Sequence, residues 1–181
     1  DCPPVVTLLH ARDDQIADFA EQALWSIWFR AGDTLANATL SRAVVMIARD
    51  EFLPALEWLS LLTVRYPHFA EVYHQRALAR LLVEQYGRAI QDARRTLHLN
   101  PLHFGAMTAK AHGHAARGEF EDALAMYHAA LQVHPRMTGV RESMARVAAC
   151  LAARGSPPRP DHAAGRPSAL DPRVPPPHPP A

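Results

Sequence analysis

Residues 70–103 read AEVYHQRALARLLVEQYGRAIQDARRTLHLNPLH, and this stretch decides the fold. Its first half carries the small residue Ala77, and its second half begins at Tyr86 and carries Ala89. Small side chains at both positions let two helices approach closely, so they predict a packed pair. Pro101 lacks a backbone donor and disfavours helix at the residue before it, so it ends the second helix. The stretch therefore predicts one helical hairpin.

The features of this hairpin recur at an interval of 34 residues. They comprise a proline, two kinds of small-residue position and an aromatic residue. The four sets are Pro67, Pro101 and Pro135; Ala43, Ala77 and Ala111; Ala55-Leu56, Ala89-Ile90 and Ala123-Leu124; and Phe52, Tyr86 and Phe120. Because four independent landmarks share one register, the sequence indicates an internal repeat.

A period of 34 residues with these landmarks resembles the tetratricopeptide repeat. The lead-in ALWSIWFRAGD, residues 23–33, also resembles that of small repeat proteins from bacteria and plant plastids. The resemblance implies an all-α fold, a right-handed solenoid of helical hairpins. The three repeats would cover residues 36–69, 70–103 and 104–137. The turn between the two helices often holds glycine in the family. Here only Gly118 matches, and Asp50 and Glu84 replace it in the first two repeats.

Two helices are expected to cap the ends of the solenoid, because an uncapped end exposes apolar surface. The N-terminal cap covers residues 14–31 and is expected to lie against the first helix of the first repeat. The C-terminal cap covers residues 138–153. In the first cap, a broad apolar face is expected to include Ile16, Phe19, Ala20, Ala23, Ile27 and Phe29, with Trp25 and Trp28 adding large area. The three tryptophans of the chain have apolar neighbours at helical spacing, which favours core packing over a ligand cage.

The remaining segments differ in character from this folded part, which spans residues 13–154. Residues 1–12 are expected to be irregular because Cys2-Pro3-Pro4 favours extended chain. Residues 155–181 hold ten of the sixteen prolines, so we expect a disordered tail that cannot bury a core. A docking segment for a proline-binding domain is the alternative interpretation of this tail.

Charge and hydropathy exclude some classes of function. The formal net charge is +1, and a nearly neutral chain has no electrostatic footprint for DNA or RNA. No apolar run reaches the roughly 20 residues of a membrane span. The chain begins with Asp1, so the sequence leaves the compartment open: cytoplasm, plastid or other organelle, and bacterial periplasm all fit.

No pattern in the sequence indicates catalysis, a cofactor or a metal. A glycine-rich phosphate loop, a Gly-x-Ser-x-Gly elbow and a Cys-x-x-Cys pair are all missing. Eleven histidines are present, but no Asp or Glu accompanies them at a spacing typical of metal sites. We therefore expect no catalytic, cofactor-binding or metal residues. Within the second repeat, Arg76 and Asp92 are expected to form an ion pair.

The resemblance to the tetratricopeptide family also implies a binding groove along the first helices of the repeats. The side chains expected to line it and bind a partner are Leu40, Val44, His74, Gln75, Leu78, Leu81, Leu82, Thr108 and His112. Some family members use this groove to bind the C-terminal carboxylate of chaperones through Lys, Asn and Arg. The five positions needed here hold Leu40, Val44, Gln75, Gly105 and Ala109, so we expect no such receptor.

The expected function is a non-enzymatic scaffold or adaptor that binds a peptide or a partner helix in an apolar groove. Three alternatives stay open. The chain could be a helical-repeat RNA-binding protein. Its own N-terminal helix or tail could fill the groove, which would give the groove a purely structural role. The protein could also associate with itself through the groove or an exposed end.

Overall fold

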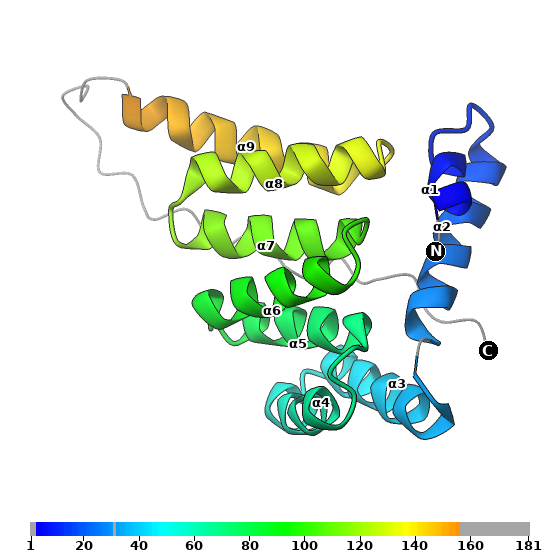
Figure 1. Ribbon diagram of the computed structural model, residues 1–181. Helices are drawn as coiled ribbons and strands as arrows, with labels where there is room; N and C mark the ends of the chain where they lie inside the picture. The colour runs from blue at the N-terminus through cyan, green and yellow to red at the C-terminus, as the bar shows by residue number, and fades with distance from the viewer. Residues whose placement is uncertain (1–2, 31, 156–181) are drawn as a thin grey trace.

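The computed structural model describes residues 3–30 and 32–155, and these residues form nine helices and no strand. Figure 1 shows the last seven helices stacked in order, with the second helix running across one side of the stack. The helices are α1 (Pro3–Leu8), α2 (Asp14–Phe29), α3 (Thr34–Ala48), α4 (Phe52–Arg65), α5 (Ala70–Leu82), α6 (Tyr86–Leu99), α7 (Phe104–Ala116), α8 (Phe120–Val133) and α9 (Thr138–Gly155). The all-α repeat fold expected from the sequence is confirmed.

Three hairpins make up the repeats: α3 with α4, α5 with α6, and α7 with α8. The small residues that recur at 34-residue spacing have no solvent exposure at all, and they are Ala43, Ala55, Ala77, Ala89, Ala111 and Ala123. A larger side chain at any of them would push two helices apart. The repeat alanines therefore set the distance between paired helices.

The turn inside each hairpin has the same left-handed backbone in all three repeats. The φ angles are 61° at Asp50, 59° at Glu84 and 77° at Gly118. Glycine adopts this conformation without strain, whereas residues with a Cβ pay a steric cost. The turn geometry is thus kept where the family's usual glycine is replaced.

The N-terminal segment differs from the expectation of irregular chain over residues 1–12. Pro3 and Pro4 begin α1, because proline is tolerated in the first turn, where the backbone N–H groups have no helical partner. Leu9, which follows α1, is fully buried in the main apolar core. Burial of Leu9 anchors the short helix against the rest of the fold.

Helix α2 reaches much further than a cap on the first repeat. It touches α3, but its tryptophans also contact α5 and α7, and Asp14 at its start pairs with Arg136 beyond α8. Its buried face is only part of the expected one, because two isoleucines and Phe19 of that face are exposed. Trp25, Trp28 and Phe29 are buried with Leu24, whereas Ile16, Phe19 and Ile27 are 44%, 69% and 45% exposed. The large aromatic side chains remove more apolar area from water than the isoleucines, so they decide the orientation.

At the other end, α9 covers the outer side of the α7–α8 hairpin through Val140, Ser143 and Val147. The expected disordered tail lies outside the described residues, apart from Gly155, which ends α9. Within the two described ranges, no helix combines the length and the hydropathy needed to cross a membrane.

Candidate functional site

The side of the stack that α2 crosses carries an aromatic cluster. The Trp25 ring stacks on His74 of α5 with centroids 5.9 Å apart, and the Trp28 ring stacks on His103 at 4.1 Å. Both tryptophans also contact Phe104, the first residue of α7, at 5.4 and 5.2 Å. The cluster joins α2 to the second and third repeats at the start of their first helices.

Glycine at position 105 makes this approach possible. A Cβ there would lie 2.8 Å from Cη2 of Trp25 and 3.1 Å from Nε2 of His74. The equivalent positions in the first two repeats hold Asn37 and Glu71. A side chain at residue 105 would displace the Trp25 ring, so the third repeat is adapted to the presence of α2.

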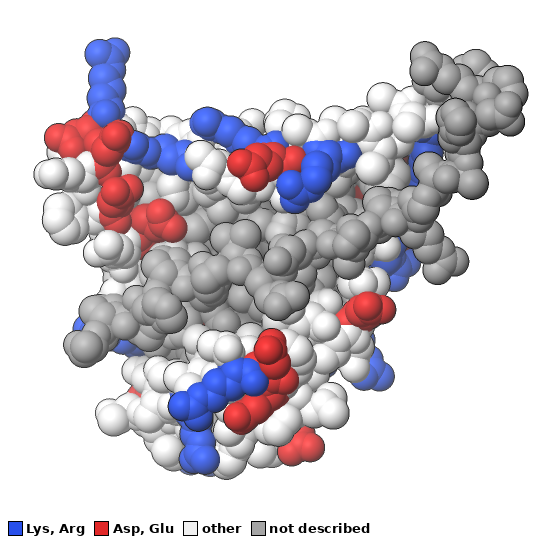
Figure 2. Space-filling model, turned by 180° about the vertical axis from the view of Figure 1, so that it is seen from behind, with Lys and Arg blue, Asp and Glu red and all other residues white. Residues whose placement is uncertain are grey.

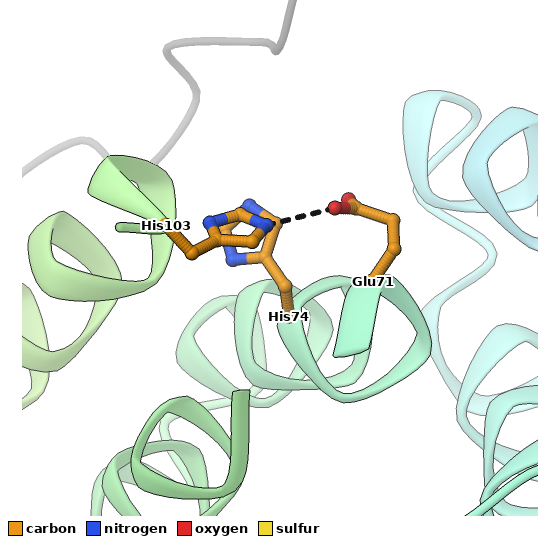
Figure 3. Close-up of side chains that lie close together, drawn as sticks. All are labelled: Glu71, His74 and His103. Atoms are coloured by element: carbon orange, nitrogen blue, oxygen red, sulfur yellow. Dashed lines mark hydrogen bonds and ion pairs between the residues drawn. The ribbon is translucent and has the colours of Figure 1, made fainter. Parts of the chain in front are cut away.

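A buried polar cluster lies beneath the tryptophans, and Figure 3 shows three of its members converging from α5 and the start of α7. His103 Nε2 lies 2.9 Å from Glu71 Oε2, and Gln75 Nε2 donates to Glu71 Oε1 at 2.7 Å. The exposed fractions of Glu71, His74, Gln75 and His103 are all 2% or less. Buried polar groups of this kind must find partners within the protein.

The hydrogen bonds of His103 fix its tautomer. The backbone N–H of Ala106 donates to Nδ1 at 3.1 Å, so Nδ1 carries the lone pair and caps the N-terminus of α7. The ring proton therefore sits on Nε2 and is donated to the carboxyl group of Glu71. His74 is less well satisfied, since its buried Nδ1 has no hydrogen-bond partner among the described residues.

Burial governs the protonation of this cluster. It raises the pKa of Glu71 to about 7, and it lowers the pKa of both His74 and His103 to about 3. Each shift disfavours the charged form, because the site holds no water-like surroundings to stabilise a charge. Near neutral pH both imidazoles are uncharged, so the contact between His103 and Glu71 is a hydrogen bond that a neutral ring donates to the carboxyl group.

Glu71, His74 and His103 can each offer a ligand atom within 4.8 Å of the others, a juxtaposition that the sequence analysis did not foresee. The sequence did not reveal this cluster, because His103 lies next to Glu71 and His74 of α5 only when the repeats stack. A metal ion at this point would need the Nε2 lone pair of His103. The ring proton would then move to Nδ1 and face the Ala106 N–H, and the capping hydrogen bond would be lost. The geometry thus favours a hydrogen-bonded network, and the expected lack of a metal stays a prediction.

Helix α2 is also attached at its first half. Glu21 accepts one hydrogen bond from Trp25 Nε1 at 3.4 Å and lies 3.0 Å from Nε2 of His134, the residue after α8. The hydrogen bond with His134 holds the pKa of Glu21 below its ordinary value, although burial opposes the shift. Together with Asp14–Arg136, this contact ties α2 to the far end of the repeat stack.

A second ionic cluster, between α5 and α6, is the pair predicted from the sequence. Arg76 makes two hydrogen bonds to Asp92, with Nε at 2.8 Å and Nη2 at 2.7 Å, and Arg80 Nη1 adds a third at 2.6 Å. Asp92 is 4% exposed. The prediction of the Arg76–Asp92 pair is confirmed, and Arg80 is a partner that the sequence analysis missed.

Comparison with known proteins agrees with this architecture. No family model matches the sequence. A curated protein of Rhizobium etli, described as TPR repeat-containing, is 23% identical over 145 residues, which cover 80% of this chain and 71% of the relative. The TPR domain of Sgt2 from Aspergillus fumigatus superposes with a TM-score of 0.66, at 16% identity, over 76% of this chain and 95% of that one. The chain has the fold of a tetratricopeptide-repeat (TPR) domain.

Two further structures are similar to this TPR chain and were determined with peptides. The first TPR domain of Spaghetti (RPAP3), bound to an HSP90 peptide, has a TM-score of 0.63 at 16% identity, over 65% of this chain and 93% of that one. The Yersinia enterocolitica secretion chaperone SycD, in complex with a peptide of the translocator YopD, has a TM-score of 0.57 at 19% identity, over 68% and 93%. At these identities the likeness concerns the fold.

The nine residues expected to line the TPR groove fall into two groups. The fully buried group consists of Leu40, His74, Gln75 and Leu81. His74 is covered by Trp25, and Leu40 lies in the same apolar core as the α2 aromatics. The partly exposed group consists of Val44, Leu78, Leu82, Thr108 and His112. The buried four can meet a partner only if the structure opens, so the accessible part of the expected groove is narrower than the sequence suggested.

Proposed function

We propose that this protein is a non-enzymatic scaffold that binds another protein along a partly exposed strip. The strip runs along the first helix of each repeat, α3, α5 and α7. The strip consists of Val44, Leu78, Leu82, Thr108 and His112, and three of these five side chains are aliphatic. The observation that supports the proposal is that aliphatic side chains stay partly exposed beside a region that α2 covers. An amphipathic helix or an extended apolar segment would fit such a strip.

The partner is proposed to differ from a chaperone tail. RPAP3 was solved with an HSP90 peptide, and the clamp that the family resemblance implies for a chaperone tail consists of Lys, Asn and Arg. Here Leu40 and Gln75 are buried, and Gly105 and Ala109 offer no side chain that could bind one. A carboxylate would lose its hydration at this surface and gain no charged hydrogen bond in return.

Two other functions gain less support. An RNA-binding role would need basic side chains in register along the repeats. On the face seen in Figure 2, basic and acidic side chains instead lie beside one another in small groups. An enzymatic role would need a reactive group next to an open cavity, and Glu71, His74 and His103 are enclosed by α2.

A purely structural role for the expected groove is the second candidate, because α2 already covers some of the groove residues. The stacking of Trp25 on His74 and of Trp28 on His103 supports this candidate. The two candidates differ in one respect: only the scaffold needs the partly exposed strip to be accessible.

The test compares two double variants that change the same residue types. Leu78→Ala with His112→Ala alters the strip, and Leu102→Ala with His98→Ala alters the end of α6 and the loop after it. Partners would first be identified by cross-linking mass spectrometry in the source cell. Calorimetry with the purified partner should then show binding weakened at least roughly ten-fold for the strip variant. Unchanged binding by the strip variant would favour the structural role.

A further inference from the structure

The first hairpin exposes positions that the other repeats bury. Leu35 and Val45 of α3 are 64% and 49% exposed. Their equivalents one repeat on, Phe69 and Ala79, are 3% and 0% exposed, and in the third repeat His103 is 0% exposed and Gly113 is buried. These residues occupy the same positions of the repeat, so their different exposure arises from the place of each repeat in the stack.

At the position of Val45, a helix of the preceding repeat covers the equivalent residues. His103, at the position of Leu35, is covered by Trp28 of α2 and by Glu71 of α5. Helix α6 presses on α7, where a Cβ at Gly113 would lie 2.7 Å from Ile90, and α4 packs on α5. Figure 1 shows α3 and α4 at the lower end of the stack, with no described helix beyond them. Helix α2 lies across the side of the stack, so it does not fill this place. The surface of α3 that carries Leu35 and Val45 therefore has no helix packed on it in the described chain.

Helix α4 adds apolar residues that the repeat does not require. Leu53, Leu61 and Val64 are 67%, 63% and 83% exposed. Trp58 is 41% exposed, so the expectation that all three tryptophans pack in the core is wrong for Trp58. The equivalent residues are Gly87, Arg95, His98 and Asp92 in the second repeat, and Glu121, Ala129, Gln132 and Met126 in the third. Since the fold accepts polar or small residues at most of these positions, the first repeat holds apolar ones for another reason.

The charges on this surface are complementary to each other. Arg42 lies in the middle of the exposed side of α3, between Leu35 and Val45, and its guanidinium rests over the Trp58 ring at 5.9 Å. Its equivalent Arg76 pairs with Asp92, but Trp58 replaces that aspartate in the first repeat. Glu57 lies in the middle of the exposed side of α4, between Leu53 and Leu61. Among the described residues, neither Arg42 nor Glu57 has an ion-pair partner.

The exposed residues of the first hairpin named above are here called the α3–α4 end face: Leu35, Arg42 and Val45 of α3, and Leu53, Glu57, Trp58, Leu61 and Val64 of α4. We propose that the α3–α4 end face is covered by the same surface of a second copy of the chain. A two-fold axis would set α3 of each copy against α4 of the other and close a four-helix bundle. Arg42 of each copy would then meet Glu57 of the other, and the apolar residues on both sides of the charges would pack together.

The two ends of the molecule support a closed pair over an open chain of copies. A head-to-tail contact would need an apolar surface at the α9 end to receive the α3–α4 end face. The large hydrophobic residues that are exposed in the described chain lie on α1 to α4, apart from Leu102 in the loop before α7. The α9 end of the described chain therefore offers no matching apolar surface, and self-pairing of the α3–α4 end face satisfies both its charges and its apolar residues.

The test measures the mass of the full chain by sedimentation velocity over a roughly hundred-fold range of concentration. We expect a dimer that Leu61→Asp converts to monomer, because the new carboxylate would face apolar residues of the other copy. Phe19→Asp is the control, since Phe19 is 69% exposed on α2, away from the end face. It should leave the dimer intact. Far-ultraviolet circular dichroism would confirm that both variants are folded.

Charge reversal tests the geometry of the pairing. Arg42→Glu and Glu57→Arg should each weaken association at least roughly ten-fold, and the double variant should restore it. A protein that is monomeric throughout would overturn the proposal. So would a dimer that survives Leu61→Asp, a dimer lost in Phe19→Asp, or a double variant as weak as the single ones.

Discussion

The turn inside each repeat keeps a positive φ angle although its residue changes from Asp50 to Glu84 to Gly118. All three have positive φ, which costs a residue with a Cβ roughly 1 kcal/mol. At Gly118 a side chain would additionally meet the guanidinium of Arg154 at 2.9 Å. The first two repeats therefore store a small strain that the third repeat avoids.

Relief of this strain is measurable at Glu84. Glu84→Gly should raise the free energy of unfolding by about 0.5–1 kcal/mol, since glycine relieves the backbone but has more entropy when unfolded. Gln85→Gly is the neighbouring control, because φ at Gln85 is −82°, and it should destabilise the protein. Urea unfolding gives both values; equal signs for the two variants would contradict the explanation.

The buried histidines make stability depend on pH. In the unfolded chain, His74 and His103 bind protons below their ordinary pKa of 6.5. In the native state they stay uncharged until much lower pH, because their native pKa is about 3. Stability is therefore lost as pH falls from about 6.5. Glu71 opposes this loss, since its native pKa of about 7 lets the native state bind a proton between pH 7 and 4.5, the pKa of glutamate in the unfolded chain.

His74→Leu separates these contributions. It removes one buried imidazole whose Nδ1 has no partner, so stability near pH 7 should be unchanged or increased. The loss of stability between pH 6 and pH 5 should shrink by about 1 kcal/mol per pH unit. Denaturant titrations at both pH values measure it. His98→Leu, at an exposed position, is the matched control. The same change of slope in both variants would contradict the role given to burial of His74.

At the scale of elements, Asp92 holds α5 to α6 through two arginines. Asp92→Asn would leave Arg76 and Arg80 with a neutral partner at a site where the aspartate is 4% exposed. Removing one member of a buried ionic cluster is costly, so unfolding should become easier by about 2–4 kcal/mol. Thermal unfolding measures the loss. Glu121→Gln, an exposed carboxylate on α8, should change stability by less than about 0.5 kcal/mol.

The attachment of α2 to the repeats depends on its aromatic face. Trp28→Ala would empty the space against His103 and Phe104 and should cost about 3–5 kcal/mol. Phe19→Ala removes an aromatic ring from the exposed side of the same helix and should cost less than about 1 kcal/mol. Hydrogen exchange of α2 amides would show whether the helix detaches locally. Equal exchange in both variants would mean that α2 is held by other contacts.

At the scale of the whole molecule, the cluster of Glu71, His74 and His103 joins elements that are distant in sequence. An ion bound there only in the native state would raise the melting temperature of the entire protein. Because the cluster is already closed by hydrogen bonds, we expect neither EDTA nor added Zn²⁺ to change that temperature. A zinc-dependent rise that Glu71→Gln abolishes would show that the network rearranges around a metal.

The sequence alone determined the helical repeat. Helix pairs, their turns and their close contacts depend on residues within one repeat, and three copies of the same pattern reinforce one another. For the same reason, Arg76 and Asp92, which lie within one repeat, could be paired correctly. The fate of the groove could not be predicted in this way.

Only the tertiary structure decided which groove residues are accessible and which face of α2 is buried. Leu40, His74, Gln75 and Leu81 occupy groove positions by register, but α2 and the neighbouring repeats enclose them. Trp25 and Trp28 meet His74 and His103 across separations of several tens of residues, and helical periodicity carries no information about such contacts. Local patterns fix each helix and its partner, whereas the path of α2 depends on which long-range packing removes the most apolar surface from water.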